Sequence, residues 1–379
     1  MQKIALFTCH HDPNYGSMLQ AYALAAVIKK MGNDAEYINY STLRDPYSLK
    51  RIIRSIIRWP IHIIRNLVKQ HKIEGEFDFF RSRDFKETML AYERFHCQYI
   101  PVSAKRYYSD TIKKKLNLYS YDIYMVGSDQ TWSPHLYRSN KPYLLDFADL
   151  PKRCAYAPSL GTTDIPKDYL KLLKQKLSSF DHISCREATN SKLLTEVLGR
   201  EVTHVLDPTL LLTCDDWDKV AKTTSIKGDY ILAYILGEKD TVIEFAEKLG
   251  NEKNLPVYYI VTRPKYLCMT NALNGIGPDD WVGLIRGSRH VVTDSYHGCL
   301  FCINYNVNFY AFSKRKGDLT SQDNARILEF LRIIGLEHRF QDDKANPKIL
   351  PDIDFSTANQ EISSMRQKSL KYLSICIED

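Results

Sequence analysis

RHVVTDSYHGCLFCI, the segment Arg289–Ile303, is the part of this chain from which the fold is most readily inferred. Its residues His290–Thr293 form a short β-branched run that is typical of a buried strand, and the apolar run Cys299–Tyr305 suits a helix. His297 therefore lies where a strand gives way to a helix. In an open parallel sheet, ligands bind at this edge because the carboxyl ends of the strands and the free N–H groups of the next helix face one crevice.

Residue type alone leaves two interpretations of His297 open. The positive end of the following helix disfavours an imidazolium, so we expect a neutral ring that is available as a base. Alternatively, the ring caps the helix or fills a corner of the core.

Two groups of residues raise the question of a metal. Cys299 and Cys302 form a CxxC, but they fall on a helix face that we expect to be buried, and no second CxxC completes a zinc site. Near the N-terminus, Cys9, His10 and His11 are also possible ligands. Adjacent residues at a strand end point to opposite sides, so these three remain unassigned. We therefore expect no metal.

Length and composition predict a folded protein of two domains. The 379 residues exceed what one core usually supports, and 44% of them are hydrophobic. The N-terminal run is too short for a secretory signal, and no apolar run reaches the length of a membrane span. Nine cysteines, an odd number, favour reduced thiols and a cytoplasmic location. The absence of a Walker A loop, a Rossmann glycine triplet and HExxH argues against an ordinary NTPase, dehydrogenase or zinc protease.

The positive charge is concentrated in one segment. The net charge of +7 arises from 52 basic and 45 acidic residues, and seven basic residues fall within 48–72, which contains no acid. This segment, SLKRIIRSIIRWPIHIIRNLVKQHK, predicts a basic amphipathic helix interrupted at Pro60. It suits the inner face of a membrane, or alternatively it packs on the protein's own body or a second subunit. The residues expected at the membrane surface are Arg51, Arg54, Arg58, Trp59 and Arg65. No recognised motif accompanies the charge, so we do not expect nucleic acid as a partner.

A strand, a loop and a helix open the chain. The pattern predicts the strand at Ile4–Thr8. NYGSMLQAYAL then leads into a predicted helix, which Ser17 could cap and which Gly32 ends. Gly16 lets the backbone approach a ligand closely, and the helix N-terminus favours an anion. An ordinary tight turn explains the same residues.

A polar loop, GSDQTW, follows the predicted strand Tyr121–Val126. Asp129 and Gln130 could form hydrogen bonds with a sugar hydroxyl there. Trp132 could stack on a sugar face. A turn whose polar groups are satisfied internally explains the loop equally well.

Two further strand ends carry polar residues. Ser159 lies in the turn after one strand, and Arg186 stands at the end of the next, just before a helix that Glu187 opens and Gly199 closes. An arginine at this position can clamp a carboxylate or a phosphate with its fork of donors. The structural alternative is a salt bridge to Glu187 or to a neighbouring loop.

A second series of alternating strands and helices occupies 230–312, and the alternation favours two Rossmann-like α/β domains that face each other across a cleft. We predict a first domain at 1–208, which carries the basic insertion, and a second at 209–350. A helical tail follows at 351–379 and is expected to cross back onto the first domain.

Six motifs, in this order, resemble those of the polysaccharide pyruvyl transferase family: NYGSMLQAYAL, VGSDQTW, YAPSLG, REATNSKLL, DPTLLL and VVTDSYHG. The resemblance extends over about Ile4–Leu336. It implies a fold like that of B-type glycosyltransferases and a cytoplasmic enzyme of exopolysaccharide or capsule synthesis. Such an enzyme transfers the pyruvyl group of phosphoenolpyruvate to two hydroxyls of one sugar, forming a cyclic ketal and releasing phosphate. It implies no other cofactor, and an acceptor that is lipid-linked or nucleotide-linked.

The resemblance also implies roles for individual residues. His297 would be the acid/base, and Arg186 would grip the donor. Other donor-binding residues would be Ser159, Ser295, Gly298, Lys314, Arg315 and Arg326. Acceptor-binding residues would be Asn14, Tyr15, Gly16, Ser17, Gln20, Ser128, Asp129, Gln130 and Trp132.

The chain departs from the family pattern at one position. Ser295 stands two residues before the histidine, where many members carry an arginine that holds the donor. Either Lys314, Arg315 or Arg326 takes the place of that arginine, or the donor is different. A glycosyltransferase that uses a nucleotide sugar, and an inactive component of polysaccharide assembly, are the alternatives to a pyruvyl transferase.

Overall fold

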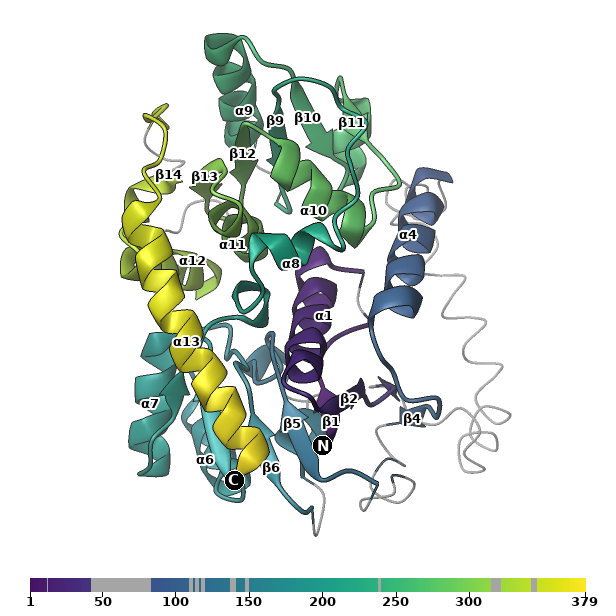
Figure 1. Ribbon diagram of the computed structural model, residues 1–379. Coiled ribbons are helices and arrows are strands. Elements are labelled where there is room, and N and C mark those ends of the chain that lie inside the picture. Colours follow the sequence, from purple (N-terminus) through teal and green to yellow (C-terminus); the bar gives the residue numbers. More distant parts are fainter. Residues whose placement is uncertain are drawn as a thin grey trace, which may run out of the picture.

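The structure, a computed structural model, describes residues 1–11, 13–41, 83–108, 112, 116, 120–136, 141–146, 150–237, 240–314, 322–341 and 346–379. Within these ranges two parallel β-sheets are covered by helices and lie one above the other (Figure 1). This arrangement confirms the predicted α/β class with two Rossmann-like domains. The basic segment 48–72, with all five of its expected membrane-surface residues, lies outside the described residues.

The first sheet has the strand order β2-β1-β5-β6-β7-β8, and its neighbouring strands pair in parallel. β1 alternates between two layers: Ile4 and Leu6 face the core that contains α1, whereas Ala5 and Phe7 face the core that contains α6 and α7. The strands are β1 (Lys3–Phe7), β2 (Asp34–Tyr37), β5 (Ile123–Val126), β6 (Arg153–Ala155), β7 (His182–Cys185) and β8 (Thr203–His204). The helices are α1 (Tyr15–Lys30), α4 (Arg83–Tyr99), α6 (Lys167–Leu177) and α7 (Ala188–Leu198).

The second sheet has the order β11-β10-β9-β12-β13-β14 and is parallel as well. β12 (His290–Thr293) pairs with β9 and β13 and is buried along its whole length, as its β-branched sequence predicts. The other strands are β9 (Ile231–Tyr234), β10 (Val257–Ile260), β11 (Ala272–Leu273), β13 (Asn308–Phe312) and β14 (Phe340–Gln341). The helices are α9 (Asp240–Lys253), α10 (Pro278–Gly287), α11 (Tyr296–Asn304) and α12 (Gln322–Ile333).

Smaller elements join these layers. β3 (Tyr40–Ser41) pairs with β4 (Tyr107–Tyr108), and the short helix α8 (Cys214–Asp218) follows the first sheet. The 3-10 turns are η1 (Pro134–Leu136), η2 (Lys141–Leu144), η3 (Pro208–Leu210), η4 (Pro264–Cys268) and η5 (Glu337–Arg339). The chain closes with the long helix α13 (Ser356–Glu378).

Three expectations about local structure were wrong or incomplete. The N-cap of α1 is Asn14, whose side chain accepts from the Ser17 N–H at 3.2 Å, because the helix begins before Ser17. Tyr107 and Tyr108 form the short strand β4, which was not predicted because it depends on pairing with β3. Helix α6 was not predicted, although its buried Tyr169, Leu173 and Leu177 recur every four residues.

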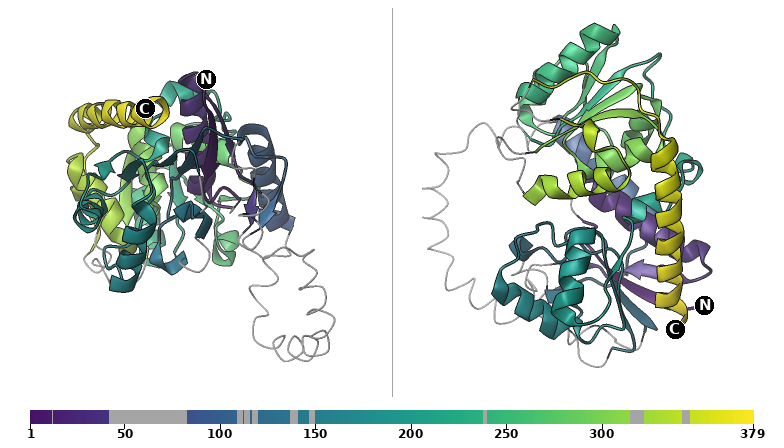
Figure 2. Two further views of the ribbon diagram at one scale, coloured as in Figure 1. Left: turned by 90° about the horizontal axis from the view of Figure 1, so that it is seen from below. Right: turned by 90° about the vertical axis from the view of Figure 1, so that its left-hand side faces the viewer.

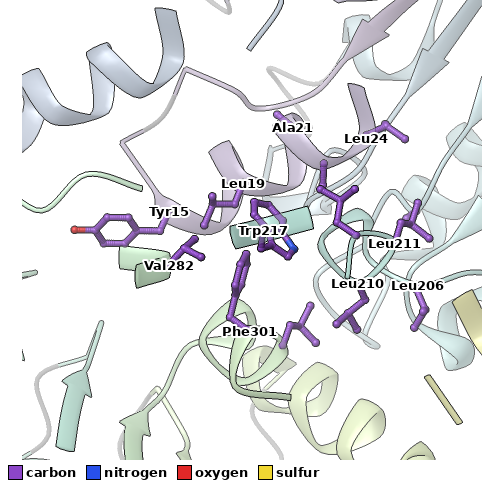
Figure 3. Close-up of a cluster of buried hydrophobic side chains, with 14 of the residues drawn as sticks. Tyr15, Leu19, Ala21, Leu24, Leu206, Leu210, Leu211, Trp217, Val282 and Phe301 are labelled. Atoms are coloured by element: carbon purple, nitrogen blue, oxygen red, sulfur yellow. The ribbon is translucent and has the colours of Figure 1, made fainter. Parts of the chain in front are cut away.

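One hydrophobic cluster connects the two domains (Figure 3). Tyr15 and Leu19 of α1 lie next to Val282 of α10 and Phe301 of α11, around Trp217 of α8. Trp217 is fully buried, with its ring 4.7 Å from that of Phe301, and its indole N–H donates to the Thr209 carbonyl at 3.0 Å. The interface between the domains is therefore packed like a core.

Helix α13 runs from the second domain back along the first (Figure 2). Its Tyr372 hydroxyl donates to the Ala155 carbonyl of β6 at 2.9 Å, and Ser369 accepts from the Leu206 N–H at 2.9 Å. Just before the helix, Asp352 pairs with Arg289 of the second domain at 2.6 Å. The last helix thus crosses back onto the first domain, as expected from the sequence.

The search for membrane spans concerns only the part of the chain that the structure describes. There, every helix is too short or too polar to cross a bilayer.

Replacing Trp217 by alanine tests the packing between the domains. We expect Trp217→Ala to lower the free energy of unfolding by about 3–5 kcal/mol, because it leaves a cavity where α1, α8 and α11 meet. Urea unfolding measures the change. The control is Leu90→Ala, because Leu90 is 60% exposed on α4 and its truncation should cost less than about 0.5 kcal/mol. Equal effects of the two substitutions would contradict the packing described for Trp217.

Candidate functional site

His297 lies between the N-terminal turns of two helices, one from each domain. It is in the first turn of α11, which Ser295 caps by accepting from the Gly298 N–H at 3.2 Å. On the other side is the first turn of α1, where a Cβ added to Gly16 would lie 2.0 Å from Nδ1 of His297. Only glycine leaves room for the imidazole there. The side chain of His297 remains 12% exposed.

Asp207 connects His297 to Arg186. Its Oδ2 atom lies 3.5 Å from Nε2 of His297 and 2.8 Å from Nη1 of Arg186. Its Oδ1 atom accepts from the backbone N–H and the hydroxyl of Thr209, at 3.0 and 2.8 Å. The carboxylate is completely buried. Among the residues that the structure describes, Nε2 of His297 has Asp207 as its neighbouring ionic group and forms no hydrogen bond of good geometry.

The environment of Asp207 keeps its carboxylate ionised. Burial by itself would raise the pKa of Asp207, but His297, Arg186 and the Thr209 N–H together outweigh burial and hold the pKa below its ordinary value. A fixed negative charge next to an imidazole stabilises the ring when it takes up a proton. The fixed negative charge of Asp207 thus lies beside the imidazole of His297, with 3.5 Å between Oδ2 and Nε2.

Arg186 is buried in a set of ionic and aromatic contacts. Its Nε atom lies 3.3 Å from Oε1 of Glu187, so the salt bridge left open by the sequence is present. The guanidinium carbon lies 4.7 Å from the centre of the Tyr296 ring. Burial would lower the pKa of Arg186, but Glu187, Tyr296 and Asp207 raise it above its ordinary value. Among the residues that the structure describes, one terminal nitrogen, Nη2, is buried without a hydrogen-bond partner.

Three residues expected to bind the donor instead support the backbone and side chains of the site. Ser159 is fully buried and donates to Oε1 of Glu187 at 2.6 Å. Ser295 is buried as the cap of α11. Gly298 is buried as well, and a Cβ there would lie 2.7 Å from the Thr293 hydroxyl. The sequence located these residues at the site but did not show that they face inward.

Two cationic residues that were predicted to bind the donor are more accessible to solvent than these three. Lys314 is exposed directly after β13, and Arg326 is half-buried on α12. The amide oxygen of Gln130 accepts from both terminal nitrogens of Arg326, at 2.7 and 2.8 Å. Arg326 also approaches the Tyr296 ring, with 5.9 Å between its guanidinium carbon and the ring centre. Arg315 lies outside the residues that the structure describes.

The GSDQTW loop reaches the start of α1 through Asp129. Its Oδ2 atom accepts from the Ser17 hydroxyl at 2.5 Å, and its carbonyl accepts from the Ser159 N–H at 2.8 Å. Asp129 has a φ of 66°, a left-handed conformation that asparagine and aspartate tolerate better than most residues. The loop thus brings Asp129 and Gln130 next to α1 and α12, which the sequence could not show.

Four residues that were predicted to bind the acceptor have buried side chains. Gln20 accepts from the Ser128 N–H at 3.1 Å, and both residues are fully enclosed. Trp132 is also fully enclosed and donates to the Tyr143 carbonyl at 2.9 Å, so it cannot stack on a sugar. Tyr15 is buried between the domains, where its hydroxyl donates to the Ile276 carbonyl at 3.0 Å.

A cavity of about 150 Å³ opens between the domains beside Asn14, which is exposed. Residues near the carboxyl ends of β9 and β10, together with residues of α4, form much of its wall. It is lined by Asn14, Tyr15, Thr88, Tyr234, Leu236 and Thr262, among others. The cavity therefore lies at the sheet edge where an open α/β domain binds ligands.

The CxxC has a structural role. Cys299 and Cys302 are both buried on α11, and burial raises the pKa of both thiols above the ordinary value. Neither thiol has the exposure and lowered pKa of a reactive cysteine.

Comparisons with known proteins identify a family and a fold. Residues 14–314 match the sequence profile of a family described as polysaccharide pyruvyl transferase, whereas no curated protein matches the chain. The UDP-GlcNAc 2-epimerase of Methanocaldococcus jannaschii is 11% identical, with a TM-score of 0.51 over 96% of this chain and 92% of that chain. The glycosyltransferase SnogD of Streptomyces nogalater is 10% identical, with a TM-score of 0.46 over 99% of both chains. The likeness to the epimerase concerns the fold alone and agrees with the predicted two-domain architecture.

The pH dependence of stability tests the state of Asp207. Because its pKa is lower in the folded than in the unfolded chain, its carboxylate stabilises the fold above the ordinary carboxyl pKa of 3.8, and this contribution is lost as the pH falls further. We expect Asp207→Asn to cost about 3–5 kcal/mol at neutral pH, since it leaves Arg186 without one of its buried partners. Urea unfolding should show this cost shrinking below about pH 4.

The control for this series is Asp168→Asn, because Asp168 is 98% exposed on α6. It should change the free energy of unfolding by less than about 0.5 kcal/mol at every pH. A cost of Asp207→Asn that stays constant down to pH values well below 4 would show that folding does not lower the pKa of this carboxyl.

A double-mutant cycle tests the contact between Gly16 and His297. We expect Gly16→Ala to cost about 1–3 kcal/mol, because the new Cβ collides with the imidazole. In a His297→Ala background the space is free, so the same substitution should be neutral or slightly stabilising. Urea unfolding of the four proteins gives the coupling free energy. A coupling near zero would mean that the two residues do not touch.

Proposed function

The chain belongs to the polysaccharide pyruvyl transferase family, and from this premise we propose that it transfers the pyruvyl group of phosphoenolpyruvate to a sugar of a surface-polysaccharide precursor as a cyclic ketal. The observation that carries the proposal is the position of His297. Its ring lies between the N-terminal turns of α1 and α11, next to the ionised carboxylate of Asp207. The imidazole can transfer protons, and the two helix N-termini supply partial positive charge for an anionic substrate.

The proposed reaction needs two proton transfers and one leaving group. A proton is added to the methylene carbon of phosphoenolpyruvate, which becomes a methyl group and leaves an oxocarbenium ion at the neighbouring carbon. One sugar hydroxyl attacks that carbon and gives up its proton, and a second hydroxyl of the same sugar displaces phosphate to close the ring. Of the two hydroxyl protons, one ends on the methyl group and the other on the released phosphate.

In this proposal the protonated ring of His297 first delivers its proton to the methylene carbon of the donor, and Asp207 at 3.5 Å stabilises that imidazolium. The neutral ring that results then takes the proton of the attacking hydroxyl, which restores the imidazolium, and the proton of the second hydroxyl leaves with the phosphate. Gly16 and Ser295 act indirectly, because the first leaves room for the ring and the second fixes the helix turn that carries it. Arg186 holds Asp207 in place and keeps one unpaired nitrogen within the same cluster.

The donor carboxylate and phosphate need cations, and Ser295 cannot supply one. We propose that Lys314 and Arg326 do so, because both have exposed surface and lie on elements that adjoin α11. The N-termini of α1 and α11 add partial positive charge in the same place. These two side chains therefore replace the family arginine in this proposal, and the donor remains phosphoenolpyruvate.

The acceptor sugar is proposed to bind from the side of the first domain. Asn14 is exposed at the cavity between the domains, and Asp129 and Gln130 bring polar groups to the same edge. We propose a lipid-linked or nucleotide-linked sugar as the acceptor and, through the basic segment 48–72, peripheral attachment to the inner face of the membrane. Nucleic acid has no part in this proposal.

Calorimetric titration with phosphoenolpyruvate tests the donor. We expect micromolar binding to the purified chain, and Lys314→Ala and Arg326→Ala should each weaken it at least tenfold, because a charge-assisted bond to an anion contributes about 1.5–3 kcal/mol. The matched control is Lys248→Ala, an exposed lysine of α9, which should bind as the unmodified chain does.

Two further titrations separate the alternatives. His297→Ala should still bind phosphoenolpyruvate but should release no phosphate from it when a panel of UDP-sugars is offered as acceptor. Binding of UDP together with no measurable binding of phosphoenolpyruvate would contradict the proposed pyruvyl transfer and favour a glycosyltransferase. Silence from both ligands would favour an inactive assembly component.

A further inference from the structure

Three histidines converge on the outer side of the first domain, where α4 packs along α1 (Figure 1). His10 and His11 follow β1, and His96 lies in the last turn of α4. One ring nitrogen from each histidine lies within 4.8 Å of the other two. Nδ1 of His10 is 3.0 Å from Nε2 of His96. Residues separated by 85 positions in the sequence thus form one group of imidazoles.

The sequence argument that separated His10 from His11 was wrong. Side chains alternate only while the backbone is an extended strand, and β1 ends at Phe7, before either histidine. Beyond that point the two rings lie against each other, with centres 3.8 Å apart and planes inclined by 41°. The adjacent pair can therefore face a common point.

The three rings differ in exposure. His10 is buried, His11 is exposed and His96 is half-buried. Among the residues that the structure describes, Nε2 of His10 has no hydrogen-bond partner. Imidazole binds metal ions through a ring nitrogen that carries a free lone pair.

We propose that His10, His11 and His96 bind a divalent transition metal ion, with zinc as the best fit. Imidazole nitrogens suit zinc, copper, nickel and iron, whereas magnesium and calcium require oxygen ligands. Three histidines with Zn–N distances of about 2.0–2.1 Å form the protein part of a tetrahedral site whose fourth position is open. The observed separations need only small side-chain rotations to reach that geometry.

A cavity of about 610 Å³ adjoins the three histidines, and His11 and His96 form part of its wall. Pro13 and Tyr92 line both this cavity and the smaller one beside Asn14. His297, Asp207 and Arg186 are not among its lining residues. The fourth coordination position would thus face solvent near the entrance to the cleft, away from the acid/base site.

The surroundings also provide support for the ligands. The Tyr37 ring packs against the His10 ring, with 5.2 Å between the ring centres, and so limits the directions in which that imidazole can turn. The competing explanation is a hydrogen bond between two neutral rings, His10 and His96, with no metal involved.

Metal titration of the full chain separates these explanations. After chelation and desalting, the chain should take up about one equivalent of zinc, or of cobalt(II) with the intense visible absorption of a tetrahedral site. His11→Ala and His96→Ala should each weaken cobalt binding at least tenfold, because each removes one ligand of three. Adding azide should shift the cobalt bands if the fourth position is open.

The matched control is His338→Ala, an exposed histidine of η5 in the second domain, which should bind cobalt as the unmodified chain does. Circular dichroism establishes that each variant is folded. Zinc should also raise the melting temperature of the unmodified chain but not that of His11→Ala. Uptake below about a tenth of an equivalent, or equal cobalt affinity in all variants, would overturn the metal site. Phosphoenolpyruvate binding is measured separately, so failure of either proposal leaves the other intact.

Discussion

The buried carboxylate of Asp207 is the interaction on which the candidate site depends. Removing a carboxylate from water costs several kcal/mol, and the cost is offset only when charges and hydrogen bonds surround it. Here Arg186, Thr209 and His297 provide them, from the end of β7, the turn η3 and the start of α11. One residue in the connection between the sheets thus fixes a cation of the first domain and an imidazole of the second. Because these side chains are enclosed together, replacing one of them leaves a buried charge or hydrogen-bonding group of another without its counterpart.

This arrangement requires that the domains hold one relative position. His297 belongs to the second domain, yet its ring touches Gly16 in the first, and a shift of about 1 Å would break the contact. The aromatic cluster around Trp217 and the stacked rings of Tyr15 and Trp281, 5.4 Å apart, fix that position. Packing far from the chemistry therefore determines the geometry at the imidazole.

Local sequence patterns predicted the helices and strands, whereas contacts between distant residues determine the roles of individual side chains. The β-branched run before His297 and the residues around position 16 were sufficient to locate a strand and a helix start, because these depend on near neighbours. Gly16 was expected to let the backbone approach a ligand, whereas the group that it admits in the structure is the imidazole of His297. Asp207 was part of a recognised motif, but its pairing with Arg186 joins distant residues, and no spacing rule reveals that. Trp132 illustrates the opposite error: an aromatic residue in a polar loop suggested a sugar platform, whereas its ring fills the core.

Helix α13 has a mechanical consequence. The chain passes between the domains once through the segment that contains Asp207, and a second time where α13 returns along β6. Two bodies joined at two points can rotate freely only about the line through both points, and twisting about any other axis strains one of the connections. Any movement that closes the two domains over a substrate is therefore restricted to rotation about this line. Asp207 lies at one of the two points, so it moves little while the outer edges of the cleft approach each other.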